Sequence, residues 1–294
     1  MKYYIKKLFH FLGLQKTLSN FSVYSPFKLY RGLLVNYRYK KYYDESLKNY
    51  KGTRVLNRDL DQNGIIVKEK VFNFSEPEIK KINKYFLDEK SCISFKESFY
   101  IEGLVQNPEY VFLKIENKLR TFLIKKLVDS DVIDLIQNHI ESNVRLVSLN
   151  LFKTLPKGFI NEGSFIWHKD NQPKNSFKLI VYLSKVDSEN LGAFKYNEGT
   201  HKKGGIIPHF GNSRDRKTPI EDGKTVFGDI GDGFIFDING FHLGGRCTDG
   251  ERIVAVYHFK PSILSFSDHL DKFNFAGIGE MEFGVNPHKI WWKN

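Results

Sequence analysis

The chain has 294 residues, 41% of them hydrophobic, which is enough to bury one sizeable core and a smaller appendage. Its two cysteines exclude a disulfide scaffold and suit a reducing compartment. The sequence lacks a phosphate-binding G-x-x-x-x-G-K-[ST] loop, a G-x-S-x-G nucleophile motif and a Cys/His cluster of the structural zinc type.

The net charge of +11 is concentrated at the N-terminus. Residues 1–54 contain twelve Lys and Arg against two acidic residues, so they carry +10 and leave +1 for the remainder. The same segment holds thirteen Tyr and Phe. We therefore expect a basic, aromatic-rich segment over residues 1–55 and a nearly neutral domain over residues 56–294.

Residues 1–14 have the pattern of a short amphipathic helix that is too short and too charged to span a bilayer. We consider three alternative roles for the N-terminal segment. Its aromatic residues can pack on the domain, which we favour because aromatic side chains are mostly buried. Residues 1–54 can instead make peripheral contact with an anionic membrane, and binding of nucleic acid by stacking ranks last. The expected location is cytoplasmic, with peripheral membrane attachment under the second alternative.

Two helices are predicted between the basic segment and the strands. Ser75-Glu-Pro-Glu78 is a capping box that opens a helix through Phe86. Apolar residues at helical spacing predict a second helix over 110–127. We expect both to brace the outside of a sheet.

The second half of the chain reads as a series of short strands separated by Gly/Asn/Asp turns. This pattern predicts a mainly β fold with flanking α-helices, with a barrel or sandwich core. His258 lies within the last of these strands, and we expect it to have a packing role there. The predicted strands span residues 145–152, 177–183, 193–196, 233–237 and 252–259.

The chain contains three His-x-Asp/Glu pairs, and composition alone gives about one. The pair at His139 lies in a helical pattern, where a solvated helix edge is the expected reading. The pair at His269 has no later arginine. Only His168-Lys-Asp170 is followed by a further histidine at a strand end, His242, and then by Arg252.

Two histidines and one carboxylate from separate strands are the ligand set of non-haem Fe(II) oxygenases. We therefore predict that His168, Asp170 and His242 bind a metal and form the catalytic centre. The strand that follows Arg252 leaves two readings for that side chain: it points into the barrel or out to solvent, depending on register.

The motifs resemble those of the phytanoyl-CoA dioxygenase family, over roughly residues 56–261. The resemblance rests on four blocks that occur in the family's order: Trp167-His-Lys-Asp170, Glu198-Gly-Thr-His-Lys202, Gly228-Asp-Ile-Gly-Asp-Gly-Phe-Ile-Phe236 and His242-Leu-Gly-Gly followed by Arg252. Two positions depart from the family pattern: the interval from His242 to Arg252 is a residue shorter, and Arg246 stands where asparagine is usual.

The resemblance implies a double-stranded β-helix core of the jelly-roll, cupin-like type, with Fe(II), the co-substrate 2-oxoglutarate and O2. Arg252 would then bind the far carboxylate of 2-oxoglutarate, since a guanidinium matches a carboxylate bidentately. Gly244 and Gly245 would let the backbone approach that co-substrate, or simply form a turn. Related halogenases have a small residue at the position of Asp170, so a carboxylate there favours hydroxylation.

The expected function is therefore hydroxylation of an unactivated C–H bond, with decarboxylation of 2-oxoglutarate to succinate. The expected substrate is a small molecule or a lipid- or carbohydrate-linked compound. The competing hypothesis is a non-catalytic metal-binding β-barrel scaffold whose basic N-terminal segment docks on a membrane or another anionic surface. The charged loop over residues 204–224, with Arg214, Arg216 and Lys217, is expected to be solvated, or alternatively to bind an anionic group of the substrate.

Overall fold

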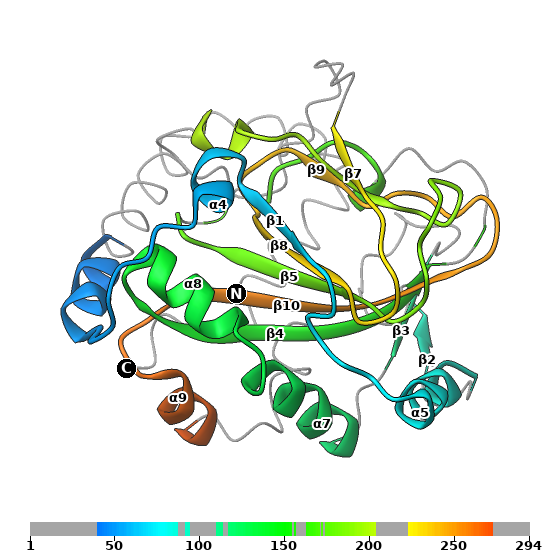
Figure 1. Ribbon diagram of the computed structural model, residues 1–294, viewed down its shortest axis with the longest axis horizontal. Helices are drawn as coiled ribbons and strands as arrows, with labels where there is room; N and C mark the ends of the chain where they lie inside the picture. Colours follow the sequence, from blue (N-terminus) through cyan, green and yellow to red (C-terminus); the bar gives the residue numbers. More distant parts are fainter. Residues whose placement is uncertain are drawn as a thin grey trace, which may run out of the picture.

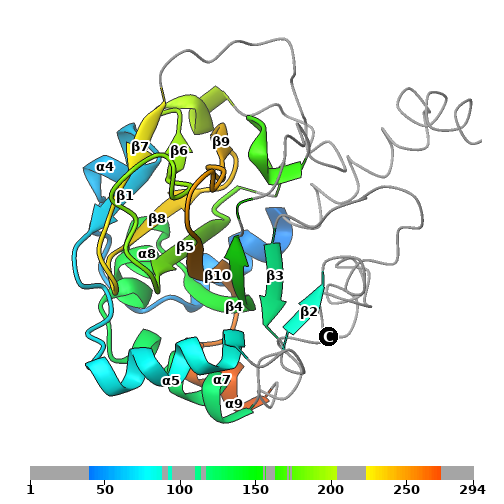
Figure 2. The ribbon, with the colours of Figure 1, turned by 90° about the vertical axis from the view of Figure 1, so that its right-hand side faces the viewer.

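The computed structural model describes residues 40–87, 92–94, 110–113, 117–154, 156, 163–170, 172, 174–203 and 223–272 (Figure 1). Within these residues the architecture has three layers: a small sheet, a large sheet and a layer of helices (Figure 2). None of the described helices is both long enough and apolar enough to cross a membrane.

The large sheet has seven antiparallel strands in the order β1-β8-β5-β10-β4-β3-β2, and the small sheet has three in the order β7-β6-β9. The strands of the large sheet are β1 (Ile65–Lys68), β2 (Cys92–Ser94), β3 (Tyr110–Leu113), β4 (Asn143–Thr154), β5 (Phe177–Tyr182), β8 (Gly233–Asp237) and β10 (Arg252–Ser262). Those of the small sheet are β6 (Phe194–Tyr196), β7 (Lys224–Val226) and β9 (His242–Leu243). The non-sequential order of two facing antiparallel sheets is that of a double-stranded β-helix, so the predicted fold class is confirmed.

Helices cover one face of the large sheet, as Figure 1 shows below strands β4 and β10. They are α5 (Glu76–Leu87), α7 (Asn117–Val128), α8 (Val132–Ile140) and α9 (Phe266–Lys272), while the short α4 (Arg58–Gln62) precedes β1. Alternate residues of β10, including Ala255, Tyr257 and Phe259, join helix residues such as Leu123 in one hydrophobic core. The predicted bracing role of the helices is confirmed by this shared core.

The opposite residues of the same strands face the small sheet. Val254 and Val256 of β10 pack with Phe194 of β6 and Phe234 of β8 in a second core. We call this side of the large sheet the inner face and the helix-covered side the outer face. Side chains alternate along a strand, so Arg252, His258 and Lys260 belong to the inner face together with Val254 and Val256.

A β-bulge in β4 shifts its register against β10 by one residue. His258 pairs with Ser148 and Phe259 pairs with Leu146, so Val147 is the extra residue. A bulge of this kind changes which face the following residues occupy. As a result Leu146 and Leu149 both lie in the outer core, and Arg145, directly opposite Lys260, lies on the inner face.

The predicted helix over 110–127 begins too early. Residues 110–113 form β3, which pairs with β2 and β4, and the helix α7 starts only at Asn117. The apolar spacing at Val111 and Ile115 fits a helix, but pairing with a long neighbouring strand outweighs a local periodicity of this length. By contrast, α5 begins where the capping box placed it, and the Ser75 backbone N–H donates to Glu78 Oε2 at 2.7 Å.

The basic N-terminal segment is described only from residue 40 onward, so the predicted helix over 1–14 lies outside the described residues. Residues 40–49 form a helix. From it the Tyr43 hydroxyl donates to the Ile140 carbonyl (2.9 Å), and the Ser142 hydroxyl donates to that of Ser46 (2.8 Å). These contacts tie the end of the segment to α8 and to the turn before β4. The division at residue 55 and the membrane contact stay predictions.

Candidate metal centre

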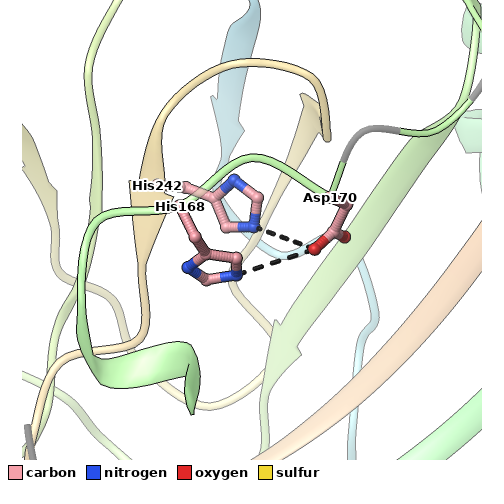
Figure 3. A group of neighbouring side chains, drawn as sticks. All are labelled: His168, Asp170 and His242. Atoms are coloured by element: carbon pink, nitrogen blue, oxygen red, sulfur yellow. Dashed lines mark ion pairs between the residues drawn. The ribbon is translucent and has the colours of Figure 1, made fainter. Parts of the chain in front are cut away.

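The three predicted ligands converge on one point (Figure 3). One ligand atom from each of His168, Asp170 and His242 lies within 4.8 Å of the others, and in the described residues no other such group of three or more His, Cys, Asp or Glu occurs. Nε2 of His168 is 3.6 Å from Asp170 Oδ1, and Nε2 of His242 is 3.9 Å from the same oxygen. The imidazole rings are 4.3 Å apart between centroids.

Backbone pairing brings these residues together although they lie far apart in the sequence. His168 and His242 form an antiparallel bridge in which each N–H donates to the other's carbonyl at 3.0 Å. The Asp170 N–H donates to the Ile238 carbonyl, also at 3.0 Å. These hydrogen bonds therefore hold the His168-Lys-Asp170 motif against the segment that carries His242.

The hydrogen bonds of the two rings determine which nitrogen carries the proton. Nδ1 of His168 donates to the Ile166 carbonyl at 2.8 Å, and Nδ1 of His242 donates to the Gly240 carbonyl at 2.9 Å. A carbonyl oxygen only accepts, so each ring carries a proton at Nδ1, and in the neutral form of the ring Nε2 presents a lone pair. Both lone pairs are on the side of Asp170, which is the arrangement that a metal ion requires of this donor set.

The electrostatics of the group also favour a cation. Burial and the neighbouring His168 lower the pKa of His242 to about 3, so the ring is neutral near pH 7. Burial by itself raises the pKa of the Asp170 carboxyl, but Lys178 and the two histidines outweigh it, and the net pKa lies below its ordinary value. Two neutral imidazoles and one carboxylate are the protonation states in which these side chains bind a metal.

Lys178, which the sequence analysis did not single out, holds the carboxylate in place. Its Nζ donates to Asp170 Oδ2 at 2.6 Å, which leaves Oδ1 facing the two histidines. Lys178 is on β5, eight residues after Asp170. A lysine at an inner position of the strand that follows the His-x-Asp motif is the signal that could have identified it.

Arg252 lies inside the barrel, which resolves the choice of register left open by the sequence. The side chain is 5% exposed, and its guanidinium donates to the Gly192 carbonyl and to Thr154 Oγ1, the latter at 3.2 Å. Its Nε is buried without a hydrogen-bond partner in the described residues. Burial lowers the pKa of Arg252, while nearby Tyr182 opposes that change. The described hydrogen bonds are with neutral oxygens, so the charged fork suits an anionic group.

The two glycines after His242 have different surroundings. A Cβ on Gly244 would lie 3.6 Å from Arg252 Nη2, so this glycine is next to the guanidinium and two residues from the distal histidine. A Cβ on Gly245 would lie 2.0 Å from the Ala193 carbonyl oxygen, a distance that only glycine permits. At Gly245 two backbone segments therefore pack directly against each other. Gly244 lies beside the Arg252 guanidinium and follows His242 by two residues.

Two other described histidines, His139 and His201, make contacts away from this centre. His139 is in α8, is half-buried and packs edge-on against Phe177 with ring centroids 5.8 Å apart, so it is less solvated than predicted. Glu141, the other member of the pair, is 45% exposed, as a solvated helix edge requires. His201 Nε2 lies 3.1 Å from the Asp61 carbonyl. The side chain of His269 and the loop with Arg214, Arg216 and Lys217 lie outside the described residues.

Solved structures similar to this chain include proteins described as α-ketoglutarate-dependent or solved with 2-oxoglutarate. SnoK, a non-haem α-ketoglutarate-dependent carbocyclase from nogalamycin biosynthesis, is 12% identical over 71% of this chain and 87% of its own, with a TM-score of 0.51. HygX from Streptomyces hygroscopicus, solved with nickel and 2-oxoglutarate, is 16% identical over 72% of this chain and 89% of its own (TM-score 0.49). The epimerase SnoN, solved with Fe3+, α-ketoglutarate and nogalamycin RO, is 15% identical over 76% and 84% (TM-score 0.49).

No protein-family model and no curated protein sequence matches the chain. At 12% identity the likeness to SnoK shows the fold alone.

Proposed function

We propose that the chain is an Fe(II)/2-oxoglutarate-dependent dioxygenase that hydroxylates an unactivated C–H bond. The observation that carries the proposal is the convergence of His168, Asp170 and His242, with both Nε2 lone pairs facing one carboxylate oxygen. This donor set would hold an Fe(II) ion and leave positions for the co-substrate and O2. The fold shared with SnoK, which is described as α-ketoglutarate-dependent, agrees with the class.

Arg252 is the residue that we assign to the far carboxylate of 2-oxoglutarate. Its buried guanidinium lies beside Gly244, two residues from His242, so an anion that reaches it is also close to the metal ligands. A buried charge held by an oppositely charged partner is much less costly than an unpaired one.

In the overall reaction R–H, 2-oxoglutarate and O2 give R–OH, succinate and CO2. When bound, Fe(II) with 2-oxoglutarate and O2 supplies the oxidising power for this change. The chain fixes the ligand positions through the Ile166, Gly240 and Ile238 carbonyls. Lys178 orients Asp170. The inner face keeps the centre out of bulk water, since His168 and His242 are each 4% exposed.

The carboxylate of Asp170 supports hydroxylation rather than halogenation. A halogenase of this type needs a vacant metal position for a halide, and Asp170 fills that position. SnoK is named as a carbocyclase, so enzymes of this fold lead to more than one outcome. Analysis of the product, in which hydroxylation adds one oxygen atom from O2, distinguishes hydroxylation from ring closure.

The test is formation of succinate from 2-oxoglutarate with Fe(II) and O2, which many enzymes of this type catalyse slowly without substrate. We expect turnover in the wild-type chain and loss of at least about a hundredfold in His168→Ala, since a metal ligand matters more than its hydrogen-bond partners. The matched control is His139→Gln, which alters the His-x-Glu pair on α8 that has no part in the centre. Equal turnover in His168→Ala and wild type would contradict the assignment, and a folded, metal-binding wild type without turnover would favour the scaffold hypothesis.

A further inference from the structure

His258, on β10, is a buried histidine of the inner face that is not among the metal ligands. Its side chain is 7% exposed, and in the part of the chain that the structure describes its Nε2 is buried and has no hydrogen-bond partner. Buried polar atoms are almost always hydrogen-bonded, because an unpaired one costs free energy. This nitrogen therefore points to a ligand.

His258 stands in the middle of a row of polar side chains that crosses three strands. Its direct cross-strand partners are Lys178 on β5 and Ser148 on β4. Residues directly opposite each other in an antiparallel pair have their side chains on the same face, with Cβ atoms about 5 Å apart. Lys178, His258 and Ser148 therefore lie side by side on the inner face, and we call them the polar row.

One end of the polar row belongs to the metal centre. Lys178 Nζ donates to Asp170 Oδ2 at 2.6 Å, so the charge of this lysine is compensated by a predicted metal ligand. His258 is one strand further along the row. It is also six residues after Arg252 on β10, which is roughly 20 Å of extended strand. A ligand at His258 therefore lies beside the metal centre and away from the site assigned to 2-oxoglutarate.

The other end of the polar row offers a neutral hydroxyl. Ser148 is 2% exposed, and its Oγ accepts from Asn150 Nδ2 at 3.5 Å. A serine hydroxyl has one proton to donate and two lone pairs, so Ser148 keeps its O–H proton for a further contact. Ser148 and His258 thus present two hydrogen-bonding groups next to each other across the β4–β10 pair.

The charge of these two groups indicates the chemical class of the ligand. Burial, followed by the charges of Lys260 and Lys178, holds the pKa of His258 well below its ordinary value, so the ring is neutral. A neutral imidazole nitrogen either accepts or donates, depending on the tautomer. A hydroxyl group complements both cases, because it donates and accepts at once. Within the row an anion finds no uncompensated charge, since Lys178 is paired with Asp170.

The inner position next to the row is apolar. Val256 precedes His258 by two residues on β10, is 7% exposed and has Ile180 as its cross-strand partner on β5. A molecule that places a hydroxyl at the polar row therefore has hydrocarbon beside it for its carbon skeleton.

We propose that His258 and Ser148 bind a hydroxyl group of the substrate, which is then an uncharged alcohol with an apolar skeleton. The word substrate rests on the proposed oxygenase function, whereas the binding site rests on the polar row. Arg252 and the polar row have separate ligands in this account: the carboxylate of 2-oxoglutarate and a neutral alcohol.

Cyclohexanol tests the site, because it joins one hydroxyl to an apolar ring. The full-length, metal-free chain, with nitrogen-15 in its histidines, is titrated with cyclohexanol, and the NMR signals of the ring nitrogens report hydrogen bonding. We expect a saturable shift of the His258 Nε2 signal and no shift at His139. His139 is the matched control, because its Nδ1 is also buried without a partner in the described residues, but its ring packs against Phe177 from α8.

Variants separate the hydrogen bonds from the fold. His258→Phe keeps a ring without its nitrogens, and Ser148→Ala loses only the hydroxyl. Each should weaken cyclohexanol binding about three- to tenfold in a ligand-observed NMR titration, which corresponds to one neutral hydrogen bond. His258→Gln keeps a hydrogen-bonding group and should bind more tightly than His258→Phe, whereas His139→Phe should bind as the wild type does. Melting temperatures of the same samples check folding.

Three results would overturn the proposal: no shift of the His258 signal in the wild type, unchanged affinity in both His258→Phe and Ser148→Ala, or a larger His258 response to cyclohexanecarboxylate or cyclohexylammonium than to cyclohexanol. The succinate assay on the same preparations keeps the two hypotheses apart. Turnover without alcohol binding rejects the substrate class alone, and alcohol binding without turnover rejects the oxygenase.

Discussion

The two faces of strand β10 differ in what they carry, although every residue of the strand is buried. The outer face contributes Ile253, Ala255, Tyr257 and Phe259 to the core beneath the helices. The inner face begins with Arg252 and ends with His258 and Lys260, with Val254 and Val256 between them. A buried charge costs several kcal/mol unless a partner compensates it, so the outer face has the composition of a stabilising core and the inner face that of a binding site.

The strongest test of this difference is a change at a ligand on the inner side. His242→Ala removes one of two neutral nitrogen donors, and we expect the affinity for Fe(II) to fall by more than about a hundredfold, because loss of even an outer hydrogen-bond partner costs ten- to a hundredfold. The measurement is metal content after equilibrium dialysis, with the melting temperature of the metal-free chain as the check on folding. Metal content equal to that of wild type would remove His242 from the ligand set.

A smaller effect is expected at Arg252. Arg252→Lys keeps the charge but loses the bidentate fork, so the apparent Michaelis constant for 2-oxoglutarate should rise about tenfold or more. Arg120→Lys is the matched control, because Arg120 is equally buried, at 5% exposure, but lies on helix α7. An equal change in the two variants would mean that burial of an arginine, and not contact with the co-substrate, sets the constant.

A substitution on the outer face should lower stability and leave Fe(II) affinity unchanged. Leu149 of β4 is 1% exposed within the outer core, and Leu149→Ala is expected to lower the free energy of unfolding by about 2–5 kcal/mol through lost burial and a cavity. Fe(II) affinity per folded molecule should stay unchanged at temperatures well below unfolding. Denaturant unfolding and dialysis on the same sample measure both, and a large loss of affinity would show that the two faces are not independent.

The smallest expected effect concerns Asp237, at the end of β8. Burial raises the pKa of this carboxyl to about 6, although the Asn239 N–H bonds it at 2.8 Å. A folded-state pKa above the unfolded value of about 4 gives stability that is complete below pH 4 and is lost as pH rises through 6, in total about 1–3 kcal/mol. Asp237→Asn should remove this decline, as read from unfolding midpoints between pH 4 and 7. An unchanged decline would assign it to other groups.

Much of the fold follows from local patterns in the sequence. The strands at 177–182 and 233–237 and the capped helix from Glu76 are marked by β-branched or aromatic runs and by a capping box. The strand at 110–113 is not marked by such a local pattern, because it forms through pairing with β4, a neighbour that is distant in sequence.

The convergence of His168, Asp170 and His242 was predictable because a ligand set constrains both residue type and chain order. The polar and charged character of the inner residues near the end of β10 was not predictable in this way. His258 was predicted as a packing residue, and it is buried, but its neighbours are Lys178 and Lys260 rather than apolar residues alone. The position of Arg145 depends on the bulge at Val147, and no local signal in the sequence marks a bulge there.

The central claim is that His168, Asp170 and His242 hold an iron that binds 2-oxoglutarate. The most direct measurement is an anaerobic titration of the Fe(II)-loaded chain with 2-oxoglutarate, followed by the weak visible charge-transfer band of the chelate. We predict a saturable band in the wild type that is absent in His168→Ala and present in His139→Gln. No band in folded, iron-loaded wild-type protein would contradict the account.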